Sequence, residues 1–399
     1  MAIRRLVAYR LKAVLTDLLD RIESLEWAKT RGEAISNAKS LGLPSSTEEL
    51  WRYTDVEDTD FDAFDLTAAK PEAQVKSEAD LVIVDGWLVV GAESSSDAWS
   101  VQTSSPQGNG VDFFSAAATA LAPHEVVIDI SADTEISIHV AITKGTVAAP
   151  LIQINTADGV SSSVSIEIVA EPSSMCLPKV LTNVGARSNA VVAIASQGAG
   201  SSLVGQIETT VGSQAQSTVE VVGGDTELSR FATVAHLSGR GSSFKMVSPS
   251  YLTATQSSDH RVLVHHEAKD TTSDLLFRNV IDGQSKSIYS GVVKIHESGA
   301  GTNAVQENKT LSLSDDAWAH SVPNLEINNN EVACSHASTV SPVDYDQQFY
   351  LQSRGLSPEV ADEAIVRGFL ADVVSKLSNS MAKRRVQEIV DHQIGKQES

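Results

Sequence analysis

One stretch near the end of the sequence pairs a cysteine with a histidine at a spacing that suits metal binding. It reads EVACSHAST at residues 331–339, and it contains Cys334, one of only two cysteines in the 399-residue chain, and His336. In a β-strand, residues two apart point to the same face, so the sulfur and the imidazole could reach one common atom. Thiolate sulfur suits zinc, copper(I) and iron–sulfur centres.

The pair by itself supplies only part of a ligand set. Most sites of these kinds use four protein ligands, so other parts of the chain or a second subunit must contribute the rest. A Cys–His catalytic pair is a further interpretation, but no third group that would orient it is evident. From the residues alone, an unliganded pair remains open as well.

The other histidines and the second cysteine indicate structural roles. His260, His265 and His266 lie in the strand-like run SSDHRVLVHHEAKD, with His260 and His266 on one face and His265 and Glu267 on the other. Histidines in a β core are more often hydrogen-bonded structural groups than ligands, and we expect that role here. Cys176 has no neighbouring histidine or acid, which favours a small buried hydrophobic residue.

Composition and missing motifs exclude several classes of function. The formal charge of −21 disfavours binding to nucleic acid or to an anionic membrane, because phosphates would be repelled. The sequence has no P-loop motif, no GxSxG, no HExxH and no CxxC. Two cysteines make no disulfide framework, and Arg10, Lys12 and Asp17 interrupt any signal-like apolar run, so we expect a cytoplasmic protein.

Three regions should position these residues, with boundaries at 1–78, 79–341 and 342–399. In the first region, apolar residues recur at helical spacing, which predicts an amphipathic helix that includes Leu11, Val14, Leu15, Leu18, Leu19 and Ile22. The second region consists of short β runs such as ISIHVAI, with apolar and polar residues in alternation and no stretch of helical period. No repeat of fixed length is present, so a large sandwich or barrel and a β-solenoid both fit the pattern.

The third region returns to helical period. Ser357 is the expected N-cap and Pro358 the first helical residue. An apolar stripe follows, made of Val366, Phe369, Leu370, Val373, Val374 and Leu377, which either packs on its own protein or docks a partner. In the last segment, MAKRRVQEIVDHQI, the basic residues Lys383, Arg384 and Arg385 should form a solvated face.

Several of these stretches together resemble the SufB/SufD family of iron–sulfur cluster assembly proteins. They are LPSSTEELWRYTDV at 43–56, then RNVIDGQSKSIYSGVVKI, DDAWAHSVPNLEINNNEVACSHASTV, DYDQQFYLQSRGL and AIVRGFLADVV. The resemblance implies a mainly β protein, with a right-handed parallel β-helix core flanked by N-terminal and C-terminal α-helical regions. It therefore favours the solenoid.

The resemblance also implies a function. Members are non-enzymatic scaffolds in a complex of a SufB-type chain, a SufD-type chain and the ATPase SufC, and a transient cluster or iron is held at the SufB–SufD interface. Ala317 and Ala337 stand where SufB-type chains carry a cysteine and a glutamate, whereas CSHASTV looks like the SufD pattern CSHGATVG. This implies a SufD-type chain with Cys334 and His336 at the shared site. Ala337 and Ser341 replace the usual glycines, which puts the closeness of that contact in doubt.

The family's SufC-docking region matches the C-terminal stripe, so the resemblance implies partner contacts for Phe369, Leu370, Val373 and Val374, and no nucleotide bound by this chain. Three alternatives stay open. One is a secreted-type β-helix enzyme that acts on polysaccharides. Another is a purely structural partner whose Cys334 and His336 stay uncoordinated, and the third is a homodimer of the chain alone.

Overall fold

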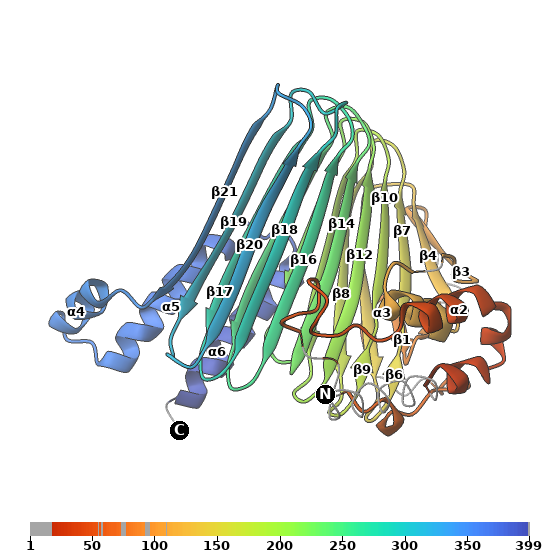
Figure 1. Ribbon diagram of the computed structural model, residues 1–399, viewed down its shortest axis with the longest axis horizontal. Helices are drawn as coiled ribbons and strands as arrows, with labels where there is room; N and C mark the ends of the chain where they lie inside the picture. Colours follow the sequence, from red (N-terminus) through yellow and green to blue (C-terminus); the bar gives the residue numbers. More distant parts are fainter. Residues whose placement is uncertain are drawn as a thin grey trace.

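The computed structural model describes residues 18–397 except 55, 57, 58, 73–76, 92–95 and 109, and the side chains of 394–397 are also outside it. Most of the chain winds into a parallel β-helix with two facing sheets and helices at both ends, as Figure 1 shows. This architecture confirms the fold expected from the family resemblance.

Each sheet gains one strand per turn of the helix. The first sheet contains, in order of pairing, β2 (Trp87–Val90), β1 (Leu81–Val84), β5 (Thr134–Ile142), β8 (Ser161–Ala170), β11 (Asn189–Gln197), β13 (Gln216–Val222), β15 (Ser243–Leu252), β17 (Thr272–Ile281), β19 (Asn303–Ser312) and β21 (Ala333–Pro342). The second contains β20 (Trp318–Ile327), β18 (Lys286–Ile295), β16 (Ser257–His266), β14 (Leu228–Leu237), β12 (Ser202–Val211), β10 (Lys179–Val184), β7 (Leu151–Thr156), β4 (Glu125–Ile130) and β3 (Trp99–Ser104). Short strands β6 (Val147–Ala148) and β9 (Met175–Cys176) pair beside them.

The turn length of the helix explains why the sequence shows no fixed repeat. Aligned residues of successive turns are 26 apart where Ser202 pairs with Leu228, but 32 apart where Lys286 pairs with Trp318. The corners between strands absorb the difference, so stacked positions drift out of any single period. A search for an exact repeat therefore misses this solenoid, although the strands of successive turns pair in register.

Alternation along each strand fills the interior of the β-helix. In β5 the apolar residues Ile136, Ile138, Val140 and Ile142 are buried, while the residues between them face outward. They join one long hydrophobic cluster that follows the helix axis from Leu81 to Ala304. The period-two prediction for ISIHVAI is confirmed.

Helices close the N-terminal end of the β-helix. They include a helix that is described from Leu18, the 3₁₀ turns Trp27–Thr30 and Phe61–Ala63, α2 (Gly32–Leu41) and α3 (Phe113–Leu121). Leu18, Leu19 and Ile22 are buried as the amphipathic pattern predicted. Leu11, Val14 and Leu15 lie outside the described residues.

The prediction of a β region without helices was wrong at α3. Every residue of α3 is buried, so the segment lacks the apolar–polar period by which a surface helix is recognised. A capping box fixes its start, in which the Asp112 side chain accepts from the Ser115 amide and the Ser115 side chain accepts from the Asp112 amide. The pattern Asp-x-x-Ser at residues 112–115 was therefore the sequence signal that could have predicted the start of this helix.

Three helices follow the β-helix: α4 (Tyr345–Ser353), α5 (Pro358–Val374) and α6 (Ser380–Gln397). The predicted N-cap is confirmed, because the Val360 amide donates to Ser357 Oγ at 3.4 Å. Helices α5 and α6 cover the outer face of the first sheet, whereas α4 projects away from the β-helix (Figure 1). No described helix is long and apolar enough to cross a membrane.

The prediction of a solvated basic face on α6 was wrong for one residue. Lys383 and Arg384 are exposed, but Arg385 is buried and forms an ion pair with Asp225, in the loop after β13. Position along α6 decides this, since Arg385 lies on the side that packs against the sheet. The ion pair helps to fix α6 to the β-helix.

Candidate metal site at the open end of the β-helix

The last turn of the β-helix, formed by β20 and β21, is left open. Within the described part of the chain, no strand pairs with the outer edge of either one. Neither strand contains a buried residue, in contrast to β18 and β19 directly beneath them. In Figure 1, β20 and β21 lie at the end of the stack nearest to the C-terminal helices.

Cys334 and His336 both face inward from β21. Cys334 aligns with the buried Ala304 of β19, and His336 aligns with the buried Gln306. The two side chains therefore share one face of one strand, as their spacing predicted. Cys334 is half-buried against the hydrophobic interior, and burial raises the pKa of its thiol, with a backbone hydrogen bond at Ala304 acting in the opposite direction. A bound metal ion or a neighbouring cation would have to stabilise its thiolate.

The interior becomes polar beneath His336. Tyr289 donates to Gln306 Oε1 at 2.9 Å, and Gln306 Nε2 donates to the backbone oxygen of Asn324 at 3.1 Å. In the next inward position, Asn308 donates to Ser321 Oγ at 2.8 Å. His336 itself is exposed above this polar layer. An inward-facing imidazole in such a position is accessible only because no further turn covers it.

The described residues do not complete a ligand set around this pair. No group of three or more histidine, cysteine, aspartate or glutamate side chains includes Cys334 or His336 in the described part of the chain. Metal binding at this point thus requires ligands from a second chain or from the bound species itself. We refer to Cys334 and His336 as the half-site, because they would supply only part of such a ligand set.

The four residues predicted to bind a partner divide into two pairs. Leu370 and Val373 are 2% and 0% exposed, since they pack on the outer face of the first sheet. Phe369 and Val374 lie at the edge of this packing and retain exposed surface. The apolar stripe thus packs on its own protein, and only its margin is available to another chain.

Phe369 lines a groove of about 770 Å³ beside that margin. The groove lies between α4, α5 and the ends of β19 and β21. It is lined by Leu311, Ser341, Pro342, Asp344, Asp346, Gln347, Tyr350, Leu351, Ala364, Ile365, Gly368 and Phe369. Helix α4 buries none of its residues, and Tyr345, Phe349 and Tyr350 are all strongly exposed on it.

The N-terminal segment that carries the family resemblance has a structural role that the sequence did not reveal. The Trp51 ring stacks on the guanidinium of Arg230, 3.7 Å from the ring centroid, and Thr54 bonds to Asp259. Arg230 and Asp259 form a buried ion pair on the outer face of the second sheet. The segment is thereby fixed across β14 and β16.

The remaining predictions for single residues agree with the structure. His260 and His266 are buried and face inward, and each contacts a serine hydroxyl. Cys176 is fully buried, which raises the pKa of its thiol far above the ordinary value. His265 differs from these two histidines, because it is only half-buried and faces outward, where it meets two groups that the sequence analysis did not connect with it, Glu267 and His296.

Comparison with known proteins decides the family. The family model described as "SUF system FeS cluster assembly, SufBD core domain" matches residues 139–369, which is more than half of the chain. The chain belongs to the SufBD family. The matched range includes the open end with Cys334 and His336 as well as most of α5, whereas the segment with Trp51 lies before it.

Relatives agree with this assignment. A SufBD family protein of Mycobacterium leprae is 31% identical over 176 residues, which are 42% of this chain and 45% of the relative. SufD of Bacillus subtilis is 31% identical over 139 residues, 35% of this chain and 32% of its own length. SufD of Escherichia coli is 26% identical over 157 residues, 39% and 37% of the two chains. The matches thus span less than half of the length of these relatives.

Proposed function

We propose that this SufBD family chain is a SufD-like, non-catalytic component of an iron–sulfur cluster assembly complex, which pairs with a SufB-type chain and works with a separate SufC-type ATPase. The observation that carries the proposal is the open last turn of the β-helix, with Cys334 and His336 facing inward from it. The names of the relatives from B. subtilis and E. coli support the SufD-like role.

Strand addition at the edge of β21 is the way in which a second β-helix would pair. The amide of Ala333 donates to Thr302 in the preceding turn. Because alternate residues of a parallel strand bond to opposite neighbours, the amides of Cys334, His336 and Ser338 point to the free edge. Val340 and Ile327 are 51% and 45% exposed on the same turn, and a partner would cover them.

A partner seated on this edge would enclose the half-site. Cys334 and His336 would then face the interior of a joined β-helix, shielded from water, and the partner would supply the remaining ligands of an iron ion or of a nascent cluster. We treat the cluster as the cargo of the complex, which binds transiently. Burial by itself raises the pKa of the Cys334 thiol and so disfavours the thiolate. The thiolate would therefore form in the enclosed site only while a metal ion is bound to it.

We place the ATPase contact at the groove between α4 and α5. Several strongly exposed aromatic side chains close together on a projecting helix usually mark an interaction site. Phe369 lies in the groove, and Phe349 and Tyr350 extend its apolar surface along α4. This contact retains Phe369 from the predicted partner-binding set, while Leu370 and Val373 would support it from beneath. Val374 is partly exposed on the same helix but does not line the groove.

The first experiment measures iron and acid-labile sulfide in the complex, purified without oxygen after co-expression with SufB-type and SufC-type chains. We expect His336→Ala to lose most of the cluster while the complex stays intact. Ser338→Ala, an inward-facing and exposed position on the same strand, is the matched control and should retain the cluster. Equal cluster content in all three proteins would leave this chain as a purely structural partner.

The state of the chain alone is a second test. Two copies could pair through the same edge, so we expect a homodimer when no SufB-type chain is present.

We infer a reducing, cytoplasmic location, because Cys176 and Cys334 are both free. Membership of the SufBD family favours these roles over polysaccharide chemistry.

A further inference from the structure

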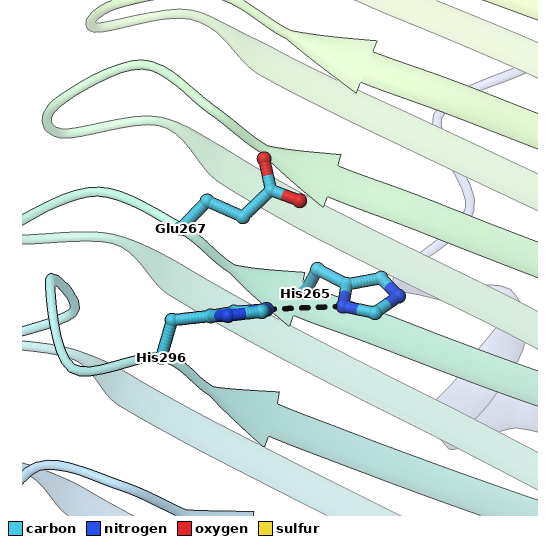
Figure 2. Close-up of side chains that lie close together, drawn as sticks. All are labelled: His265, Glu267 and His296. Carbon is cyan, nitrogen blue, oxygen red and sulfur yellow. Dashed lines mark hydrogen bonds between the residues drawn. The ribbon is translucent and has the colours of Figure 1, made fainter.

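A second group of potential metal ligands lies on the outer face of the β-helix. His265 faces outward near the end of β16, Glu267 follows that strand directly, and His296 directly follows β18 in the next turn. Figure 2 shows the three side chains converging at this corner. This face is opposite to the interior into which Cys334 and His336 project, and it belongs to earlier turns.

The distances within this group are short enough for one ion. His265 Nδ1 and His296 Nε2 are 3.2 Å apart and share a hydrogen bond, which Figure 2 marks. One ligand atom from each of the three residues lies within 4.8 Å of the other two. Ligand atoms around an ion with metal–nitrogen bonds of about 2.0–2.1 Å are about 3–3.5 Å apart. Because all three side chains are only half-buried, small rotations would bring them to that spacing.

A fourth residue orients the carboxylate. His236, at the corresponding place one turn earlier, donates from Nδ1 to Glu267 Oε1 at 2.9 Å. Its ring stacks on that of His265, with the centroids 4.8 Å apart and the planes 5° from parallel. Ligating carboxylates in metal sites are commonly held by such a hydrogen bond.

The charges around the group also suit a cation. Glu267 contributes an anion, and the nearest base on β18, Lys294, is paired with Glu326 at 3.4 Å.

We propose that His265, Glu267 and His296 bind a first-row divalent metal ion, with His236 as a positioning residue for Glu267. Two imidazoles and one carboxylate are the protein ligands of many zinc sites and of non-haem iron(II) sites, and both kinds leave coordination positions open for water or another ligand. The site would serve this chain alone, without ligands from a partner. It is thus distinct from the half-site at Cys334 and His336.

Binding of Co²⁺ to the purified full-length chain tests the site. The titrations are followed by visible absorption and by equilibrium dialysis, in a Cys334→Ala/His336→Ala background that removes the other candidate ligands. We expect about one Co²⁺ per chain and a loss of affinity of about 100-fold or more for His296→Ala. His236→Ala should weaken binding by about 10-fold, because it frees Glu267 without removing a ligand. Zn²⁺ should displace the Co²⁺ signal.

The matched control is His139→Ala. His139 also faces outward from a strand and has Glu167 at 3.6 Å, but no second histidine of the described residues joins them in a ligand group. We expect this variant to bind Co²⁺ as the background does. Unchanged affinity in His296→Ala, or an equal loss in His139→Ala, would overturn the proposal.

Thermal unfolding separates binding from folding. Without metal, His296→Ala should unfold close to the temperature of the background, because the side chain is half-exposed. With Zn²⁺ present, the unfolding temperature should rise in the background and not in the variant. A rise of the same size in both proteins would also contradict the site. None of these outcomes depends on cluster assembly, so the proposed function could fail while this site stands.

Discussion

The two ends of the β-helix are built in opposite ways. At the N-terminal end, both sheets finish in short antiparallel strands, because β2 pairs with β1 and β3 pairs with β4. Helices α2 and α3 then cover that end with a separate hydrophobic cluster. At the C-terminal end, β20 and β21 are ten residues long, parallel to their neighbours and without a further strand among the described residues.

A tight hairpin ends the first sheet at the closed end. Asp85 and Gly86 form its two-residue turn, with φ values of 48° and 86°, as a type I′ turn requires. Asp85 also accepts from the Thr143 amide and hydroxyl at 2.8 Å each, which fixes the turn to the next strand. The chain reverses here, so the first sheet ends in an antiparallel strand that does not continue the turns of the β-helix.

The interiors differ as well. The turns near the closed end enclose mostly apolar side chains such as Ile154, and the polar side chains among them are small, as with the bonded hydroxyls of Thr156 and Ser162. The last turns enclose the larger amide side chains of Gln306 and Asn308. A solenoid has to stop stacking at both ends, and the two ends show two solutions. The closed end is completed by its own chain. The open end has two long strands whose outer edges no described strand covers, above a polar interior.

The largest expected effect concerns the N-terminal segment that extends from the closed end over the second sheet. Asp259→Ala would remove the buried partner of Arg230 and of Thr54, and it should lower the free energy of unfolding by about 3–5 kcal/mol. Urea unfolding measures this. Asp270→Ala, which breaks the exposed pair with Arg240, is the control and should cost no more than about 1 kcal/mol.

That segment also makes a contact near the open end. The Tyr53 ring packs against His320 and Trp318 of β20, with centroids 4.2 and 5.1 Å away. If Asp259→Ala lowers the free energy of unfolding no more than Asp270→Ala does, the buried ion pair does not fix the segment. The difference between the closed and the open end would then come from the β-helix strands alone.

The next effect compares the interiors directly. Ile154→Ala in the closed half should lower the free energy of unfolding by about 2–5 kcal/mol, because the cavity is fully enclosed. Leu325→Ala in the last turn should cost about 1 kcal/mol, since Leu325 is only partly buried and water can fill the space. Equal losses in urea unfolding would show that the open end is as well packed as the closed one.

A smaller effect depends on pH. His260 is buried beside Phe277, and burial lowers its pKa to about 4. The unfolded chain therefore binds a proton more readily, so stability is complete above pH 6.5 and declines as the pH falls from 6.5 toward 4. At pH 5 the loss from this group is about 2 kcal/mol.

The variant His260→Gln tests this origin. Unfolding free energies at pH 7 and pH 5 should differ less in the variant than in the wild type, because one buried titrating group is gone. An unchanged difference between the two pH values would mean that other groups cause the acid sensitivity of the interior.

The substitution with the smallest expected effect on stability should have the largest effect on pairing with a partner chain. Ser338→Pro would remove an amide that points to the free edge of β21, so the bonds between β19 and β21 remain and the cost should stay below about 1 kcal/mol. Pairing with a SufB-type chain should nevertheless be lost, as size-exclusion chromatography of the co-expressed chains would show. An intact complex would mean that the partner does not add a strand here.

Local patterns allowed much of the fold to be predicted. Alternation identified the strands and their inner faces, and the Ser357–Pro358 pair marked the start of α5, because both signals depend on neighbouring residues only. The family resemblance supplied the solenoid, which the pattern left open. Helix α3 was missed because complete burial removed its periodicity.

The candidate sites show the same limit. Placing Cys334 and His336 on one inward face needed only a strand. Connecting His265 with His296 needed the length of one turn, which varies between 26 and 32 residues as the corners take up extra residues. The burial of Arg385 likewise depended on which side of α6 meets the sheet.

The sequence by itself therefore determined the strands, the caps and the directions of side chains, since these follow from periods of 2 and 3.6 residues. Only the tertiary structure decided which turns stack, which histidines meet across them, and that one end of the β-helix is closed while the other is open. The physical reason is that stacking depends on the summed lengths of many corners, and no local pattern encodes that sum.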